Sequence, residues 1–366
     1  RPPRSTLFPY TTLFRSNHAL LAIDAIEGAP VLPQHSVLIV DEAHELASRV
    51  TGVATGELTA GGVQRAARRA AKLVDEKTAD ALQSAADSFE RLLEVASPGR
   101  LPQIPEDLAY TLGALQDAAR AAVTALGESR DASVTDAEAV RRQALAAVEN
   151  VHAVAERVVA GAEHDVVWYA PHDRWGASLR VAPLSVSGLL REKLFADRSV
   201  ILTSATLKLG GDFHGVGAML GLPPEGAASE QGPRWRALDV GSPFDYRRQG
   251  ILYVARHLSP PGRDGARRDM VEELAELVAA AGGRTLGLFS SMRAARTAAE
   301  ELRERLDFPI LLQGEETLGE LIRAFADDAR TCLFGTLSLW QGVDVPGPSC
   351  QLVVMDRVPF PRPYDP

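Results

Sequence analysis

Two adjacent carboxylates follow a short apolar run near the start of the chain. The segment reads VLIVDEAH, with Asp41 and Glu42 directly after residues 37–40. A continuous β-branched run of this length is typical of a buried strand in a parallel sheet, and α/β proteins place their sites at the carboxyl ends of such strands. Two carboxylates there suit metal-assisted phosphoryl chemistry, in which one holds magnesium and the other orients or deprotonates water. A strand followed by a helix whose amino end favours acidic residues would give the same pattern.

A second polar motif, VILTSATL, occupies residues 200–207. Small hydroxyl side chains at the end of a strand can hydrogen-bond an acidic motif on the neighbouring strand. Alternatively, Ser204 or Thr206 caps a helix in an ordinary turn between a strand and a helix. The presence of VLIVDEAH upstream favours the first interpretation.

A long Ala-rich segment separates the two motifs. It repeats apolar residues at i, i+3 and i+4 and is rich in strong helix formers, with a proline-rich break at residues 97–107. This pattern predicts an all-helical insertion at residues 46–165.

Strands and helices alternate after the insertion, and a Gly/Pro-rich stretch interrupts the alternation once. Alternation of this kind is typical of parallel sheets with helices on both faces. The sequence therefore predicts an α/β fold. Its predicted parts are a first domain from residues 17–45 and 166–225, the insertion at 46–165, a linker at 226–240, and a second domain at 241–366.

The first 16 residues differ in character from the rest. TLFPYTTLFRS, residues 6–16, has neither helical nor strand periodicity, and Pro9 and Arg15 interrupt any apolar core that a signal peptide would need. The stretch resembles the translation of a sequencing-adaptor oligonucleotide. Residues 1–16 are therefore expected to be foreign to the protein and to have no part in its fold.

Composition excludes several classes of protein. The sequence has 46% hydrophobic residues and 24% charged ones, as an ordinary globular protein has, and it has no run of about 18 apolar residues. Two cysteines without CxxC spacing predict neither a disulfide framework nor a zinc site, and they suit the cytoplasm. The net charge of −9 argues against nucleic-acid binding by bulk attraction, but it leaves a local basic groove open.

One basic cluster is a candidate for such a groove. Arg65, Arg68, Arg69 and Lys72 could contact phosphate. Residues 46–165 as a whole hold 13 Lys and Arg against 18 Asp and Glu, so a solvated helix face is the default interpretation. Trp168 and Tyr169 could stack on bases, but core packing is favoured for both.

Four segments in order, DEAH, TSATL, GRTLGLFSSMRAA and GTLSLWQGVDVPG, resemble motifs II to V of superfamily 2 helicases. NHALLAIDA, SPFDYRRQ and VVMDRVPFPRPYDP narrow the resemblance to the DinG/XPD branch, and it covers residues 17–366. The resemblance implies two RecA-like domains, with the helical insertion as an arch beside which single-stranded DNA passes. It also implies ATP and magnesium as cofactors, 5′-to-3′ DNA helicase activity on single-stranded or forked DNA, and a monomer.

The resemblance also assigns candidate roles to individual residues. Asp41 would coordinate magnesium, Glu42 would activate water, and His44 would link the nucleotide site to the helicase core. The residues that would couple hydrolysis to DNA movement are Ser204, Ala205 and Thr206. The DNA-binding candidates are Ser290, Ser291, Asn17 and His18, and those facing the cleft between the domains are Gln341, Gly342 and Asp344.

The sequence departs from the helicase pattern in three ways. It contains no GxxxxGK[ST] phosphate loop, no four-cysteine set for an iron–sulfur cluster, and no arginine-bearing motif VI. The chain is therefore expected to be a fragment that is inactive by itself, and an iron–sulfur cluster is left open for a longer protein. Two alternatives are a non-catalytic DNA-binding relative and a DEAH-box RNA helicase, and the long insertion between DEAH and SAT disfavours the latter.

Overall fold

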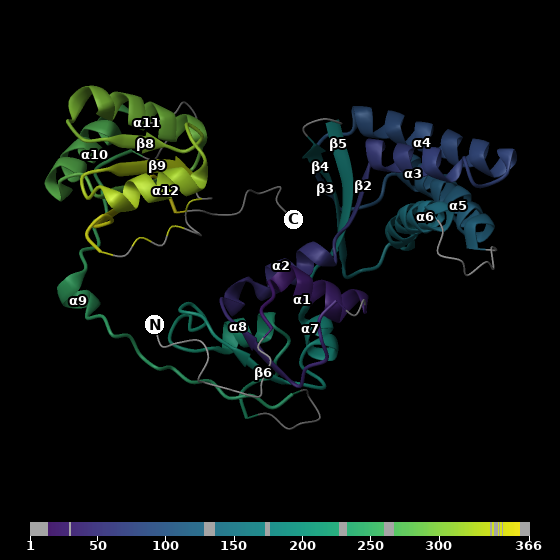
Figure 1. Ribbon diagram of the computed structural model, residues 1–366, viewed down its shortest axis with the longest axis horizontal. Helices are drawn as coiled ribbons and strands as arrows, with labels where there is room; N and C mark the ends of the chain where they lie inside the picture. The colour runs from purple at the N-terminus through teal and green to yellow at the C-terminus, as the bar shows by residue number, and fades with distance from the viewer. Residues whose placement is uncertain are drawn as a thin grey trace. The chain divides into compact units, whose positions relative to one another are not determined.

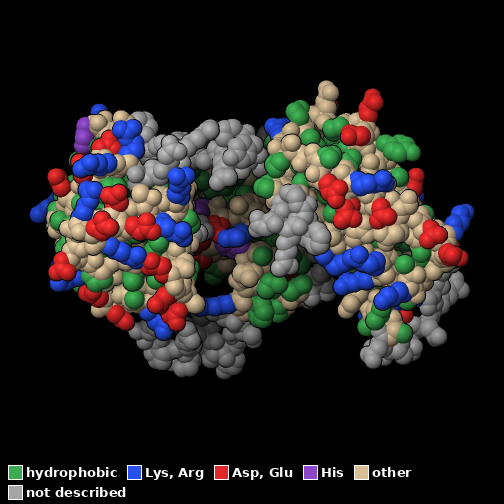
Figure 2. All heavy atoms as spheres, turned by 90° about the horizontal axis from the view of Figure 1, so that it is seen from above, with side chains coloured by type: hydrophobic (Ala, Val, Ile, Leu, Met, Phe, Trp, Pro, Cys, Tyr) green, Lys and Arg blue, Asp and Glu red, His purple; other side chains and the backbone are tan. Residues whose placement is uncertain are grey.

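The chain forms two compact units, residues 1–241 with 364–366, and residues 242–363 (Figure 1). The computed structural model describes residues 14–28, 31–127, 136–172, 176–226, 233–259, 267–336, 339, 343, 345 and 347–358. No helix among these residues is long and apolar enough to cross a membrane. Acidic and basic side chains are interspersed over the face shown in Figure 2.

A parallel pair of strands carries the two polar motifs of the first unit. β1 (Val37–Val40) runs beside β6 (Ser199–Leu202), with Val40 opposite Leu202. Val40 is buried among apolar residues of the surrounding helices, whereas Ile39 and Ile201 are exposed. The helices that supply this core are α1 (His18–Ala22), α2 (Leu46–Val53), α7 (Ser187–Lys193) and α8 (His214–Met219), with a π-helix at Ile23–Glu27.

Four helices of the predicted insertion pack around one apolar core, whereas α2 at its start packs in the core around β1. They are α3 (Ala60–Ala70), α4 (Glu76–Val95), α5 (Glu106–Gly127) and α6 (Asp136–Ala160). Side chains at the amino ends fix where two of them begin, because Thr59 accepts a hydrogen bond from the N–H of Gly62, and Asp75 accepts one from Thr78. Leucines and alanines on facing helices fill the core, so the small residues allow close packing.

The insertion was predicted to be all-helical, and this prediction is wrong. It includes the short strands β2 (Gly56–Thr59) and β3 (Gly99–Leu101). Together with β4 (Asp165–His172) and β5 (Gly176–Pro183) they form an antiparallel sheet in the order β2-β5-β4-β3. Strands of three or four residues are too short to show a periodicity, and their partners lie far away in sequence. The sheet packs on the helices through residues such as Leu58, Val167 and Leu179.

The second unit has the α/β architecture that the sequence predicts. Its sheet is parallel, in the order β10-β7-β9-β8, and the strands are β7 (Thr285–Phe289), β8 (Ile310–Leu312), β9 (Cys332–Thr336) and β10 (Leu352–Met355). The helices α10 (Arg268–Ala281) and α11 (Met292–Arg305) pack on one face, and α12 (Leu318–Asp327) packs on the other (Figure 1). A short helix, α9 (Tyr246–Gln249), precedes this α/β part. The predicted α/β class with parallel sheets is thus confirmed.

Candidate functional site

The DEAH and SAT motifs meet where β1 and β6 end. The ladder continues beyond both strands, because the N–H of Thr203 donates to Val40 O at 2.9 Å and the N–H of Ala43 donates to Thr203 O at 3.0 Å. Parallel strands bring their carboxyl ends to one edge of a sheet. The two motifs, far apart in sequence, therefore face each other as predicted from their positions after the strands.

The hydroxyl of Ser204 lies at the centre of this site. It donates to Oε2 of Glu42 at 3.1 Å and lies 2.9 Å from Nδ1 of His44. A serine hydroxyl has one proton, so Nδ1 of His44 is the donor in the second contact. The N–H and the hydroxyl of Thr206 both lie 3.3 Å from the same oxygen. Ala205, between them, contributes no polar side chain. One side chain of the SAT motif thus contacts two residues of the DEAH motif.

Glu42 adopts a backbone conformation that is unusual for its type. Its φ of 50° and ψ of 44° lie in the left-handed region, which costs a non-glycine residue about 1–3 kcal/mol. Directly after Glu42, the chain enters a short 3₁₀-helix, Ala43–Glu45, which carries His44. The turn allows Glu42 and His44 to contact each other at 3.3 Å while both reach Ser204.

Asp41 has the chemistry of a magnesium ligand. Its Oδ1 accepts a hydrogen bond from the N–H of Glu42 at 3.1 Å. Magnesium in nucleotide sites is usually held by one or two carboxylates, with phosphates and waters completing the octahedron. Among the described residues no group of three or more His, Cys, Asp or Glu side chains is placed to hold a metal. A single carboxylate fits a magnesium ion that depends on a nucleotide for its other ligands.

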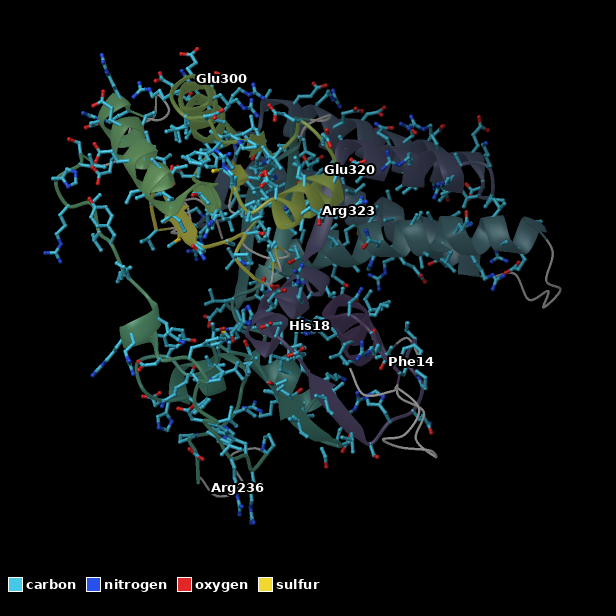
Figure 3. The ribbon with its side chains drawn as sticks, turned by 60° about the vertical axis from the view of Figure 1, so that its left-hand side comes forward. Phe14, His18, Arg236, Glu300, Glu320 and Arg323 are labelled. Carbon is cyan, nitrogen blue, oxygen red and sulfur yellow. The ribbon has the colours of Figure 1, made fainter. Side chains whose placement is uncertain are left out.

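The segment NHALLAIDA, which begins with Asn17 and His18, contacts the DEAH motif through His18. Asn17 caps α1, where its Oδ1 accepts from the N–H of Leu20 at 2.8 Å. His18, on the first turn of α1 (Figure 3), places Nε2 2.8 Å from the carbonyl oxygen of Asp41. Sequence reasoning grouped both residues with the DNA-binding candidates and did not find the contact between His18 and Asp41. No spacing rule links the two segments, so only the fold reveals it.

In the second unit, the two serines of GRTLGLFSSMRAA, the segment that resembles motif IV, have separate structural partners. Ser290 donates from its N–H and from its hydroxyl to the carboxylate of Asp356, at 2.9 and 2.7 Å. Ser291 caps α11 through the N–H of Ala294 at 3.2 Å. Both serines are exposed at the carboxyl end of β7. Asp356 directly follows β10, the neighbour of β7, so the same edge-of-sheet argument could have identified it.

The segment GTLSLWQGVDVPG, which resembles motif V, begins at the end of β9. The side-chain oxygen of Gln313 accepts hydrogen bonds from the N–H of Thr336 at 2.8 Å and from its hydroxyl at 3.2 Å. This contact fixes the start of the motif against the segment that follows β8. The three cleft candidates of this motif, Gln341, Gly342 and Asp344, lie outside the described residues.

The two aromatic candidates, Trp168 and Tyr169, are core residues. Trp168 and Tyr169 on β4 are each only 8% exposed. Burial raises the pKa of Tyr169 to about 12, with a smaller contribution from Asp107. Neither ring offers a face to a nucleic-acid base, which confirms the prediction of core packing.

Comparisons with known proteins relate nearly the whole chain to helicases. Residues 274–366 match the family described as a helicase C-terminal domain. The chain is 50% identical to the ATP-dependent helicase DinG of Mycobacterium tuberculosis over 361 residues, which are 96% of this chain and 53% of that protein. It is 37% identical over 201 residues to the ATP-dependent DNA helicase YoaA of Escherichia coli, which covers 54% of this chain and 30% of that protein. The solved structure XPD_APO matches 93% of this chain and 65% of that one, with 14% identity and a TM-score of 0.46.

The chain thus combines a DEAH motif and a SAT motif, joined at the carboxyl ends of a parallel strand pair, with a segment that matches a helicase C-terminal domain. Over nearly its whole length the chain is similar to a DinG helicase, to which half of the aligned residues are identical. The resemblance found in the sequence is thereby confirmed. The chain spans about half the length of the curated relatives that it matches along its whole sequence.

Proposed function

We propose that the protein containing this chain is a DNA helicase that couples ATP hydrolysis to 5′-to-3′ movement along single-stranded DNA. The observation that carries the proposal is the contact of the Ser204 hydroxyl with both Glu42 and His44. A hydroxyl shared between two motifs can transmit a change at one of them to the other. The identity with ATP-dependent helicases supports ATP as the nucleotide, and the polarity and the monomeric state rest on the family resemblance alone.

The family resemblance implies the proposed roles, and the contacts at the carboxyl end of β1 support them. Asp41 would hold magnesium, and the ion would supply positive charge beside the phosphates of the nucleotide. Glu42 orients and deprotonates the attacking water. Ser204 and Thr206 couple the nucleotide site to DNA movement, and His44 orients the Ser204 hydroxyl.

The proposed setting is the cytoplasm, with single-stranded or forked DNA as partner. Two cysteines, Cys332 and Cys350, are free thiols, which suits a reducing compartment. Burial raises the pKa of both thiols, so they favour the neutral form and act as packing residues.

The test is ATP hydrolysis by the complete gene product, with and without single-stranded DNA. The locus is first resequenced across the codons for residues 6–16, because this stretch resembles the translation of an adaptor. Glu42→Gln should reduce hydrolysis by at least about 100-fold and leave ATP binding intact, since general-base catalysis contributes about 10²–10⁴-fold. Ser204→Ala should keep basal hydrolysis within a few-fold and lose most of its stimulation by DNA.

Three outcomes would contradict the proposal. DNA binding without any hydrolysis by the wild-type protein would identify a non-catalytic relative. Stimulation by RNA in place of DNA would identify an RNA helicase. An unchanged DNA stimulation in Ser204→Ala would refute the coupling role of the shared hydroxyl.

A further inference from the structure

An ion pair joins the end of the SAT motif to the segment that leads into the second unit. Nζ of Lys208 lies 2.7 Å from Oδ2 of Asp239, which is 31 residues further along the chain. Lys208 follows closely after Thr206, the last hydroxyl residue of the motif. The family resemblance assigns no role to either member of the pair. The contact therefore lies next to the candidate site without being part of it.

The carboxylate of Asp239 also fixes the backbone where the first unit ends. Its Oδ1 accepts a hydrogen bond from the N–H of Gly241 at 2.9 Å. Gly241 has a φ of +72° and is the residue after which the chain enters the second unit. A carboxylate that accepts from the N–H two residues ahead closes an Asx turn, and glycine adopts the left-handed conformation at no steric cost. Residues 239–241 are here called the exit turn.

The chain just before the exit turn is held against the first unit. The indole N–H of Trp235 donates to the carbonyl oxygen of Pro223 at 2.7 Å. Its ring lies so near α8 that a Cβ at Gly217 would be 3.2 Å from it. The N–H of Ala237 donates to Oε1 of Glu225 at 3.1 Å. The chain is thus fixed on the first unit as far as the exit turn.

The position of Lys208 depends on the SAT motif. Leu207, directly before it, packs on the core of the first unit. Leu209, directly after it, exchanges two backbone hydrogen bonds with Asp212, at 2.9 and 3.3 Å, which close a tight turn. Because the backbone is held on both sides, Lys208 has little freedom to move independently of the motif. A change in the contact between Ser204 and the DEAH motif would therefore shift Lys208 as well.

An ordinary surface ion pair is the alternative explanation. The side chains of Lys208 and Asp239 are 41% and 49% exposed, and pairs of this kind contribute little to stability. This pair differs in that its carboxylate also holds the exit turn, so breaking it disturbs more than two side chains. A weak contact also suits a switch, because a ligand shifts an equilibrium only by its difference in affinity for the two states.

We propose that Lys208 and Asp239 are positioning residues that transmit a change at the SAT motif to the exit turn. When Ser204 leaves the DEAH motif, Lys208 shifts with it, its pair with Asp239 breaks, and the exit turn is released. The chain is then less restrained where it enters the second unit. The step from the nucleotide to the SAT motif rests on the proposed helicase function, whereas the step from the SAT motif to the exit turn does not.

The test is hydrogen exchange of the complete gene product, followed by mass spectrometry at labelling times of milliseconds to seconds. The peptide of interest covers residues 236–243. Lys208→Met should speed its exchange about two- to five-fold, the range that an exposed ion pair can supply. Ser204→Ala should also speed its exchange, but it should add nothing in the Lys208→Met background, because both changes release the same contact.

Two further variants distinguish transmission from general loosening of the fold. Lys208→Arg keeps the ion pair and should retain slow exchange of the peptide. The matched control, Lys193→Met, removes an exposed lysine on α7 of the same unit and should exchange like the wild type. Equal acceleration in Lys193→Met and Lys208→Met would overturn the proposal, as would wild-type exchange in Lys208→Met. Full additivity of Ser204→Ala and Lys208→Met would overturn it too.

ATP hydrolysis by the same proteins separates this proposal from the helicase function. Lys208→Met should keep hydrolysis without DNA within about two-fold of the wild type and lower the stimulation by single-stranded DNA about two- to five-fold. Unchanged stimulation in Lys208→Met would also overturn the proposal. If the wild type is stimulated by DNA but Lys208→Met exchanges normally, only the transmission proposal fails. If the exchange results are as expected but the wild type hydrolyses no ATP, only the helicase proposal fails.

Discussion

The close approach of Gly283 to Arg330 allows a sharp prediction about the second unit. Gly283 has a φ of +82°, and a Cβ at this position would lie 1.9 Å from the carbonyl oxygen of Arg330 and 2.7 Å from its carbonyl carbon. Gly283 lies just before β7, and Arg330 lies just before β9, the strand that pairs with β7. The contact thus sets how closely these two strands approach at their amino ends.

The neighbouring Gly282 provides a matched control. Its φ of +67° is also left-handed, and a Cβ there would meet nothing within 4 Å. Gly282→Ala should therefore lower the free energy of unfolding only by the cost of holding an alanine in the left-handed conformation, about 1 kcal/mol. Gly283→Ala adds a clash with a backbone atom, which no side-chain rotation can relieve, so it should cost at least about 3 kcal/mol.

Calorimetry of the two variants measures the difference. At about 4 °C for each kcal/mol, Gly282→Ala should lower the Tm of the second unit by about 4 °C and Gly283→Ala by at least about 12 °C. Hydrogen exchange should show faster opening of the amides in β7 and β9 for Gly283→Ala alone. Equal Tm values for the two variants would refute the argument that strand approach is limited at Gly283.

Two further predictions concern ion pairs. Arg157 binds both carboxylate oxygens of Asp165 at 2.6 and 2.7 Å and the carbonyl oxygen of Ala54 at 2.7 Å. Arg157→Ala should therefore lower the free energy of unfolding by about 1–2 kcal/mol, a value discounted for partial exposure. Arg49→Ala, which removes an exposed ion pair with Glu45, should lower it by about 0.5 kcal/mol or less in the same denaturant titration, and equal losses in the two variants would contradict this. Hydrogen bonds from Arg303 hold the pKa of Glu315 below its usual 4.5. A pKa that is lower in the folded state stabilises the fold above about pH 4.5, and this stabilisation is lost as the pH falls through the folded value. Between about pH 5 and pH 3 the wild type should therefore lose stability more steeply than Glu315→Gln. Parallel curves of stability against pH for the two proteins would refute the assignment.

The strands and helices of the second unit could be predicted from the sequence because each has a strong local pattern. Apolar residues recur at helical spacing in α10, and β7 is a short continuous apolar run. The strands β2 and β3 could not be predicted in this way. β2 is stabilised by its pairing with β5, which includes an ion pair between Glu57 and Arg180, 123 residues apart. Pairing at that separation depends on the tertiary fold and leaves no local pattern.

The candidate site, too, could be predicted from the sequence only in part. Residue type and position at strand ends predicted that Glu42 and Ser204 would lie close together, and they do. The left-handed backbone of Glu42 could not be predicted, because a glutamate rarely adopts it without tertiary support. The pairing of Ser290 with Asp356 also depends on the order of strands in the sheet, with β10 beside β7.

The contacts of the DEAH motif explain how so short a segment can respond to two other parts of the first unit. The carbonyl of Asp41 contacts His18 of α1, the N–H of Ala43 donates to Thr203, and the side chain of Glu42 accepts from Ser204. The segment is thus fixed from α1 on one side and from the end of β6 on the other. Since the left-handed conformation of Glu42 costs free energy, these contacts must offset that cost. A shift of the SAT motif away from Glu42 would remove one of them and favour a relaxed backbone. Glu42 is therefore the residue of this site whose position depends most directly on where Ser204 lies.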